Sequence, residues 1–191
     1  MASVLYSRCH LGFLSSYLSL GQSKRAQQRH GAQILGVMVL SRLLQRPVSN
    51  DELKRNAAGA PVHAEAYISL SHSGDWVAAA AAFNPVGIDV EVVKPGRPLA
   101  AMAAQFDWPE QQFYGRWCTF EAALKTGVVD ISGKDIRQHR GQLKLPSGQY
   151  LYSYTSQHPL FMSIACVTNS RPKWQSPVLM ADEYLLESPA P

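Results

Sequence analysis

Four charged residues in the middle of the chain have the types and spacing of a site for a metal ion and a phosphate. Asp89 and Glu91 lie two residues apart in a β-branched stretch, so on a strand both carboxylates project from the same face. Trp117, Glu121 and Lys125 recur every four residues, so on a helix they share one stripe. A strand and a helix that present three acids and one lysine to a common point would bind a hard cation and a phosphate.

The expected ion is Mg²⁺ or Mn²⁺, because oxygen-only ligand sets favour these ions, which keep several waters and bridge to phosphates. Two plainer interpretations compete with this one. Asp89 and Glu91 would be solvated residues of an edge strand, and Glu121 and Lys125 a surface pair worth about 0.3 kcal/mol. Trp117 on the same stripe favours a partly buried face, on which an acid without a cation is costly.

Length and composition are those of a globular protein. The 191 residues are 46% hydrophobic and 17% charged, which excludes the disordered class. The net charge of +4 is mild and fits an acidic partner or a phosphorylated ligand. Basic residues gather in the first third of the chain, but no binding motif accompanies them, so we expect no nucleic-acid partner.

The three cysteines predict reduced thiols and a cytoplasmic protein. Cys9, Cys118 and Cys166 are widely spaced and form neither a metal-spaced group nor a disulfide framework. Cys118 is expected to fill space behind a helix rather than act as a nucleophile. No apolar run reaches membrane-spanning length, and the stretch 11–20 lacks a good cleavage site, so we expect neither a membrane partner nor a signal peptide.

Periodicity and turn residues predict the elements that must position these residues. A helix is expected from Ser23, its N-cap, to about residue 46, because Pro47 stops it. A second helix is expected to start from a capping box of Asp107 and Glu110 and to end near Thr126. Strands and a short helix are expected elsewhere: strands at 67–71, 76–83, 86–93, 142–145, 149–155 and 160–168, and the short helix at 99–105.

A weak internal repeat suggests two similar halves. Tyr67–Asn84 and Tyr152–Asn169 align without gaps at an offset of 85 residues, so a helix followed by three strands occurs twice. The predicted fold is therefore α+β, with two halves in a pseudo-twofold arrangement, each a helix packed on a mainly antiparallel three-stranded sheet. A ligand would sit in the cleft between the halves. The expected boundaries are 1–95 for the N-terminal half, 96–170 for the C-terminal half and 171–191 for an extended C-terminal tail.

Three ordered motifs resemble those of the Sfp-like 4′-phosphopantetheinyl transferases. The first is Ser-Leu-Ser-His-Ser-Gly at 69–74, and the second is Gly-Ile-Asp-Val-Glu at 87–91. The third is Trp-Cys-Thr-Phe-Glu-Ala-Ala-Leu-Lys at 117–125. Their order and rough spacing agree with the family, and the similarity runs from about residue 23 to residue 168.

The resemblance implies transfer of 4′-phosphopantetheine from coenzyme A to a serine of an acyl or peptidyl carrier protein. It implies that Asp89, Glu91 and Glu121 hold Mg²⁺ (or Mn²⁺) against the pyrophosphate. Glu121 would take the serine proton, directly or through a water molecule, and Lys125 would neutralise developing charge, so the catalytic residues would be Glu121, Lys125 and Asp89. The cofactor-binding residues would be Arg25, Arg29, Ser71, His72, Asp89 and Lys125.

Two positions depart from the family pattern and keep an alternative open. The family has a lysine before the metal-binding glutamate, where this chain has Phe120, and a Gly-Lys-Pro element, where this chain has Ala60. The alternative is a degenerate relative that binds a carrier protein or coenzyme A without catalysis, and a third hypothesis is a metal-dependent phosphoester hydrolase. The expected partner is an acidic carrier protein, and a two-halved chain has little need to dimerise, so we expect a monomer.

Overall fold

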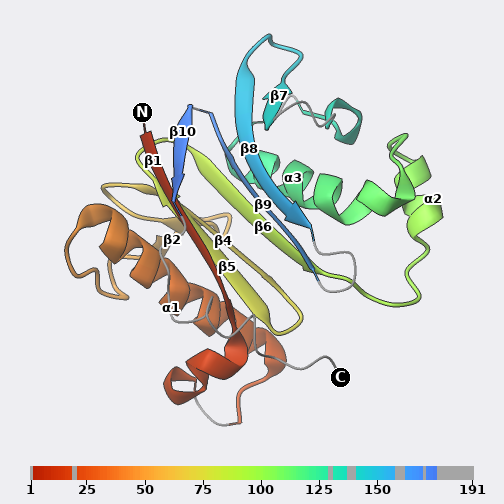
Figure 1. The fold of residues 1–191 in the computed structure, drawn as a ribbon. Helices are drawn as coiled ribbons and strands as arrows, with labels where there is room; N and C mark the ends of the chain where they lie inside the picture. Colours follow the sequence, from red (N-terminus) through yellow and green to blue (C-terminus); the bar gives the residue numbers. More distant parts are fainter. Residues whose placement is uncertain are drawn as a thin grey trace.

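The computed structural model describes residues 2–18, 21–128, 131–136, 141–157, 162–169 and 171–175. The protein has an α+β fold, as predicted, with two four-stranded sheets whose inner faces pack against each other and a main helix on the outer side of each (Figure 1). The first sheet has the strand order β10-β1-β5-β4, and the second has the order β6-β9-β8-β7.

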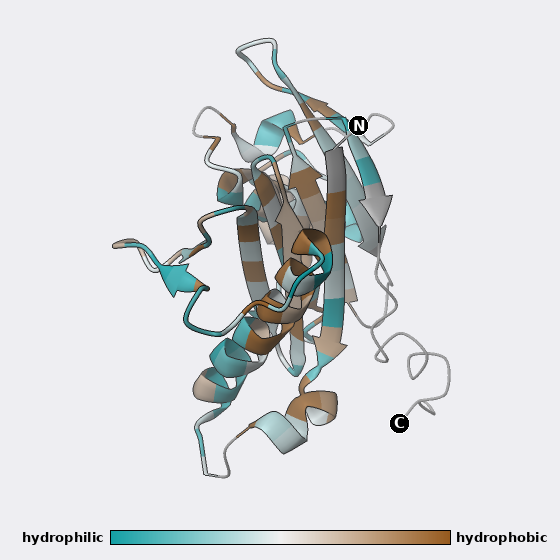
Figure 2. Ribbon diagram, turned by 90° about the vertical axis from the view of Figure 1, so that its left-hand side faces the viewer, coloured by the Kyte–Doolittle hydropathy of each residue, from teal (hydrophilic) through white to brown (hydrophobic). Residues whose placement is uncertain are grey.

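The first sheet packs against helix α1, Lys24–Leu44. Its strands are β1 (Ala2–His10), β4 (Tyr67–Ser73), β5 (Trp76–Ala82) and β10 (Pro172–Gln175). Ser23 caps α1 as predicted, because its hydroxyl accepts a hydrogen bond from the amide of Ala26. Figure 2 looks onto the outer side of α1, which lies in front of the strands. Leu35, Val39 and Leu40 of α1 are fully buried against these strands.

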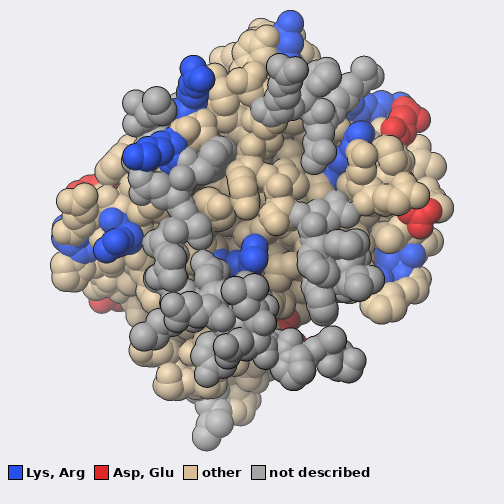
Figure 3. All heavy atoms as spheres, viewed as in Figure 1, with Lys and Arg blue, Asp and Glu red and all other residues tan. Residues whose placement is uncertain are grey.

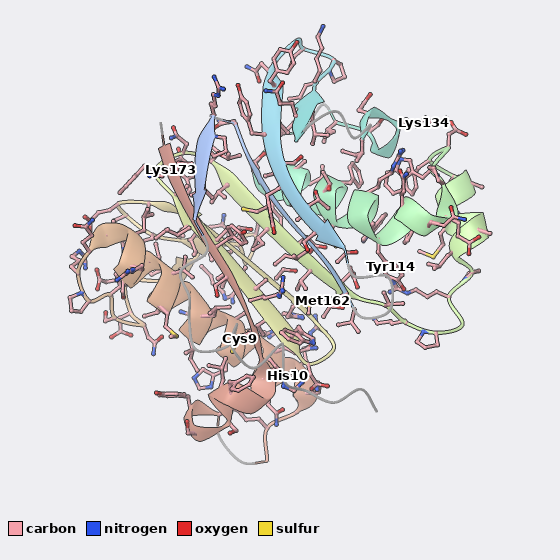
Figure 4. The ribbon with its side chains drawn as sticks, viewed as in Figure 1. Cys9, His10, Tyr114, Lys134, Met162 and Lys173 are labelled. Carbon is pink, nitrogen blue, oxygen red and sulfur yellow. The ribbon has the colours of Figure 1, made fainter. Side chains whose placement is uncertain are left out.

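The second sheet packs against helix α3, Phe113–Lys125. Its strands are β6 (Val86–Val92), β7 (Gln142–Lys144), β8 (Tyr150–Gln157) and β9 (Met162–Thr168). The short helix α2, Leu99–Ala104, and a 3₁₀ turn at Glu110–Gln112 lead into α3. Tyr114, labelled at the start of α3 in Figure 4, accepts a hydrogen bond from the amide of Lys94 and so fixes the chain that arrives from β6.

The remaining short elements are peripheral. Strands β2 (Lys54–Arg55) and β3 (Pro61–Val62) form a small hairpin between α1 and β4. Two 3₁₀ helices lie at Leu11–Tyr17, after β1, and at Gly133–Asp135, after α3. No helix in the described ranges combines the length and the apolar character that crossing a bilayer requires.

A third layer of core lies between the two sheets. It consists of Val4 and alternate alanines of β5 on one side and of β6 and β9 side chains, among them Ile88 and Ile164, on the other. The intervening alanines, Ala79 and Ala81, face α1. Both faces of β5 are therefore buried at close range, which explains why its alanine run forms a strand despite the helix propensity of alanine.

Both sheets have four strands where three were predicted. Strand β1 was not predicted, because its inner face carries Tyr6, Arg8 and His10, and these side chains obscure the alternation of a half-buried strand. Strand β10 pairs in parallel with β1 and occupies the start of the predicted extended tail, whose residues from 176 onwards lie outside the described residues. A parallel pairing between the two ends of a chain has no local sequence signal.

The predicted capping box is wrong. Asp107 adopts a left-handed backbone (φ 57°) and α3 starts only at Phe113, without a side-chain cap at its first residue. The helix ends as predicted, with Thr126 as C-cap and Gly127 at φ 88° after it.

The repeated segments form equivalent hairpins, β4–β5 and β8–β9. Their registers differ by one residue, because Tyr67 pairs with Ala82 whereas Tyr152 pairs with Thr168. Strand β6 belongs to the predicted first half of the chain but pairs with β9 of the second. The pseudo-twofold relation and the boundary at residue 95 stay predictions.

Candidate functional site

Helix α3 lies unusually close to strand β6 at Gly87. A methyl group built on Gly87 would lie 1.8 Å from the carbonyl oxygen of Ala122 and 3.1 Å from Cβ of Lys125. Only glycine permits this approach. The glycine of the Gly-Ile-Asp-Val-Glu motif thus lets the helix that carries Glu121 and Lys125 lie directly on the strand that carries Asp89 and Glu91.

Asp89 is the centre of the hydrogen-bonding network between these elements. Its Oδ1 accepts a hydrogen bond from Lys125 Nζ at 2.7 Å and another from Ser71 Oγ at 2.8 Å. Lys125 Nζ also donates to the backbone carbonyl of Ile88 at 3.0 Å. The second oxygen, Oδ2, is buried and has no hydrogen-bond partner among the described residues. A buried carboxylate oxygen without a donor is costly, and a bound cation would satisfy it.

The two glutamates lie beside Asp89. Glu91 accepts a hydrogen bond from Ser73 Oγ through Oε2 at 2.9 Å. Partial burial raises the pKa of Glu121 above its ordinary value, and the negative charge of Asp89 raises it further, while Lys125 opposes the shift. Burial together with a like charge is the environment that favours a neutralising cation. The structure therefore brings all four charged residues of the sequence prediction into one neighbourhood.

The carboxylate oxygens of the three acids do not lie close enough together to coordinate one ion. In the part of the chain that the structure describes, Asp89, Glu91 and Glu121 do not bring one oxygen each within 4.8 Å of one another. Their mutual repulsion opposes a closer approach. The chemistry of the donor set still fits the predicted ion, because all three ligands are carboxylates and one oxygen is buried without a partner.

A pocket of about 780 Å³ has Lys125 in its wall, whereas Asp89, Glu91 and Glu121 are not among its lining residues. Its walls come from α1, the outer face of β4, the β2–β3 hairpin and the end of α3. Its basic side chains are Arg29, Arg55, Lys125 and, when protonated, His63 and His72, whereas its one acid is Glu65. Lys125 both lines the pocket and bonds Asp89, so an anion in the pocket and a cation on the acids would lie side by side.

His72 stands among positive charges at the pocket wall. Partial burial lowers its pKa below the ordinary value, and Lys125 lowers it further, followed by Arg25 and Arg29. Both arginines are therefore within electrostatic reach of His72, but of the two only Arg29 lines the pocket. In Figure 3 the basic side chains on the face shown lie in several separate places.

The two departures from the family pattern have structural explanations. Phe120 packs with Phe106 and Trp117 in the aromatic cluster beside α3, so this position contributes to the core. Ala60 lies in the hairpin that lines the pocket, where Arg55 supplies a cation from the same hairpin. Sequence reasoning missed Arg55, and its only signal was its place five residues before Ala60.

Cys118 lies behind the acids and is inert, as predicted. It is fully buried and its thiol lies 3.4 Å from the carbonyl oxygen of Ser163, to which it donates. Burial raises the pKa of Cys118 well above its ordinary value, and the charges of Asp89 and Glu91 add to this effect. The thiol is therefore protonated at neutral pH and is no nucleophile.

A second group with metal-ligating side chains lies beside the β2–β3 hairpin and includes two residues of the pocket wall, His63 and Glu65. One ligand atom each of Glu52, His63 and Glu65 lies within 4.8 Å of the others. The guanidinium of Arg46 already bridges the two glutamates, so this group holds its own cation. Nothing in it resembles the predicted metal site.

Comparison with known proteins adds independent information. No family model matches the chain. A protein of Haemophilus influenzae named "Putative 4′-phosphopantetheinyl transferase" is 30% identical over 74% of this chain and 71% of its own length. A 4′-phosphopantetheinyl transferase of Bacillus subtilis is 32% identical over 38% of each chain. At 30% identity over most of both chains, the first of these relatives establishes that the chain belongs to the 4′-phosphopantetheinyl transferases.

Proposed function

We propose that the protein transfers 4′-phosphopantetheine from coenzyme A to a serine of an acidic carrier protein. The observation that supports this most is the position of Lys125, which joins a pocket rich in cations to the carboxylates of the site. Coenzyme A carries a pyrophosphate and a further phosphate, so its charge is complementary to Arg29, Arg55, His72 and Lys125, with Arg25 nearby. The net charge of +4 favours an acidic protein partner.

Asp89, Glu91 and Glu121 would hold Mg²⁺ or Mn²⁺, which neutralises charge on the pyrophosphate when bound. Lys125 orients Asp89 and places a second positive charge at the pocket. The carrier serine forms a new P–O bond to the β-phosphorus, and the bond from that phosphorus to the bridging oxygen breaks, which releases adenosine 3′,5′-bisphosphate. Glu121 takes the serine proton, directly or through a water molecule. Positioning and charge neutralisation supply most of the acceleration.

The test is an incubation of the full chain with coenzyme A, Mg²⁺ and an apo carrier protein, followed by intact mass measurement of the carrier. We expect the carrier to gain the mass of one phosphopantetheinyl group. Carrier binding without a mass gain would support the degenerate binding relative instead. Release of adenosine bisphosphate in the absence of any carrier would support the hydrolase.

His72 provides a pH test of the pocket. Its pKa is lowered in the free protein, and a bound phosphate raises it again, so coenzyme A binding takes up a proton. Affinity should therefore rise as the pH falls from the pKa of the bound state towards that of the free state. We expect the coenzyme A affinity of His72→Gln to lack this rise at lower pH, as measured by titration calorimetry from pH 8 to pH 6.

The ligand's own phosphates titrate in the same range but act equally on both proteins, so the difference between the two curves isolates His72. Parallel curves for the parent and the variant would show that His72 does not meet a phosphate.

A further inference from the structure

The edges of the two sheets are joined by three serine hydroxyls. Ser69, Ser71 and Ser73 alternate along β4, and their Oγ atoms accept hydrogen bonds from the amides of β6 at 3.1, 3.3 and 3.1 Å. The three amides belong to Ile88, Val90 and Val92. Both strands are edge strands of their sheets, so these amides have no partner strand and the hydroxyls satisfy them.

Two of the three hydroxyls also donate to a carboxylate. Ser71 Oγ donates to Asp89 Oδ1 at 2.8 Å, and Ser73 Oγ donates to Glu91 Oε2 at 2.9 Å. In each case the serine bonds the acid eighteen residues further along the chain. The position that corresponds to Ser69 is Gly87, which has no side chain. The hydrogen bond from a β6 amide to a β4 serine thus occurs three times. In two of the three cases the serine also donates to a carboxylate.

A serine hydroxyl has one proton, so a hydroxyl that donates to a carboxylate cannot donate to another acceptor at the same time. The Ser71 proton goes to Asp89 Oδ1, which Lys125 also holds, and this orientation leaves Oδ2 as the buried oxygen without a partner. Ser71 is itself buried against β6. Its hydroxyl is therefore poorly placed to serve a phosphate in the pocket and well placed to fix the rotamer of Asp89.

We propose that Ser71 and Ser73 are positioning residues, which hold Asp89 and Glu91 so that their remaining oxygens face the cation. This inference rests on the metal site of the proposed function. It assigns Ser71 a role behind the carboxylate in place of the predicted phosphate contact. Hydrogen bonds to ligating carboxylates orient the ligand, and their loss typically weakens metal affinity about 10- to 100-fold.

The test compares Mn²⁺ binding by the full chain and by three variants, Ser69→Ala, Ser71→Ala and Ser73→Ala, from the electron paramagnetic resonance signal of free Mn²⁺. Each variant leaves one amide of β6 without its acceptor, so a loss of stability in urea is expected for all three. We expect Ser71→Ala and Ser73→Ala to bind Mn²⁺ about 10- to 100-fold more weakly. Ser69→Ala should keep the parent affinity, because its hydroxyl touches no acid.

A second measurement separates positioning from phosphate binding. Coenzyme A affinity measured with a chelator, in the absence of divalent ions, should be unchanged in Ser71→Ala. Ser71→Thr, which restores the hydroxyl, should recover most of the Mn²⁺ affinity.

Equal Mn²⁺ affinities of Ser69→Ala and Ser71→Ala would overturn the inference and leave the proposed function standing. Weaker coenzyme A binding by Ser71→Ala without metal would overturn it in favour of a phosphate contact. If the parent chain binds no Mn²⁺ at all, the metal site of the proposed function fails and this inference fails with it.

Discussion

Replacing Asp89 by asparagine is expected to lower kcat/KM for transfer by about 1,000-fold or more. The change keeps the shape of the side chain and an oxygen that accepts from Ser71 and Lys125, but it removes the negative charge. The buried second oxygen, which has no partner in the described part of the chain, becomes an amide group that repels a cation. A factor of 1,000 corresponds to about 4 kcal/mol, which is the scale of charge stabilisation by one metal ion.

The measurement is the initial rate of carrier modification at saturating and limiting Mg²⁺, with circular dichroism as the test of folding. Asp107→Asn is the matched control, because it makes the same chemical change at an exposed side chain that pairs with Lys134. Its left-handed backbone tolerates asparagine well. If folded Asp89→Asn has a transfer rate within tenfold of the parent, Asp89 is not a catalytic residue.

Much of the candidate site could be predicted from the sequence because its residues lie in two short segments of regular spacing. Alternation along a strand and a four-residue period along a helix determine that Asp89 and Glu91 share one face and that Glu121 and Lys125 share another. The structure then shows both faces meeting at Gly87. Local geometry was sufficient to group the charges. The pocket was not predicted in this form, because its lining comes mostly from α1, β4 and the β2–β3 hairpin, and only Lys125 and Thr126 come from the second half of the chain.

The parts that were missed depend on long-range placement. The role of Ser73 requires β4 and β6 to meet edge to edge, although they belong to different sheets. The alternation of serines at 69, 71 and 73 was visible in the sequence, but nothing local indicates which strand it faces. Strand β1 was missed for a similar reason, since its place between β5 and β10 is fixed by pairings with distant segments.

Gly87→Ala is expected to destabilise the protein by about 3 kcal/mol or more and to abolish transfer. The new methyl group would lie 1.8 Å from the Ala122 carbonyl oxygen and 2.9 Å from its carbon, and these are backbone atoms of α3 that cannot rotate away. The helix must therefore move off β6, at a cost at the upper end of that for overpacked cores. For a chain of this size the melting temperature should fall by about 6–12 °C.

The loss of activity follows from the same displacement, because Glu121 and Lys125 move with α3 while Asp89 and Glu91 stay on β6. Gly36→Ala is the matched control on α1, where a methyl group would lie 2.9 and 3.0 Å from the ends of Leu70 and Leu53 and 3.8 Å from the end of Ile68. Those side chains can adopt other rotamers, and alanine favours the helix, so we expect a change below about 1 kcal/mol. If Gly87→Ala has the melting temperature and the transfer rate of the parent, α3 does not need its close approach to β6, and the glycine of the motif has another role.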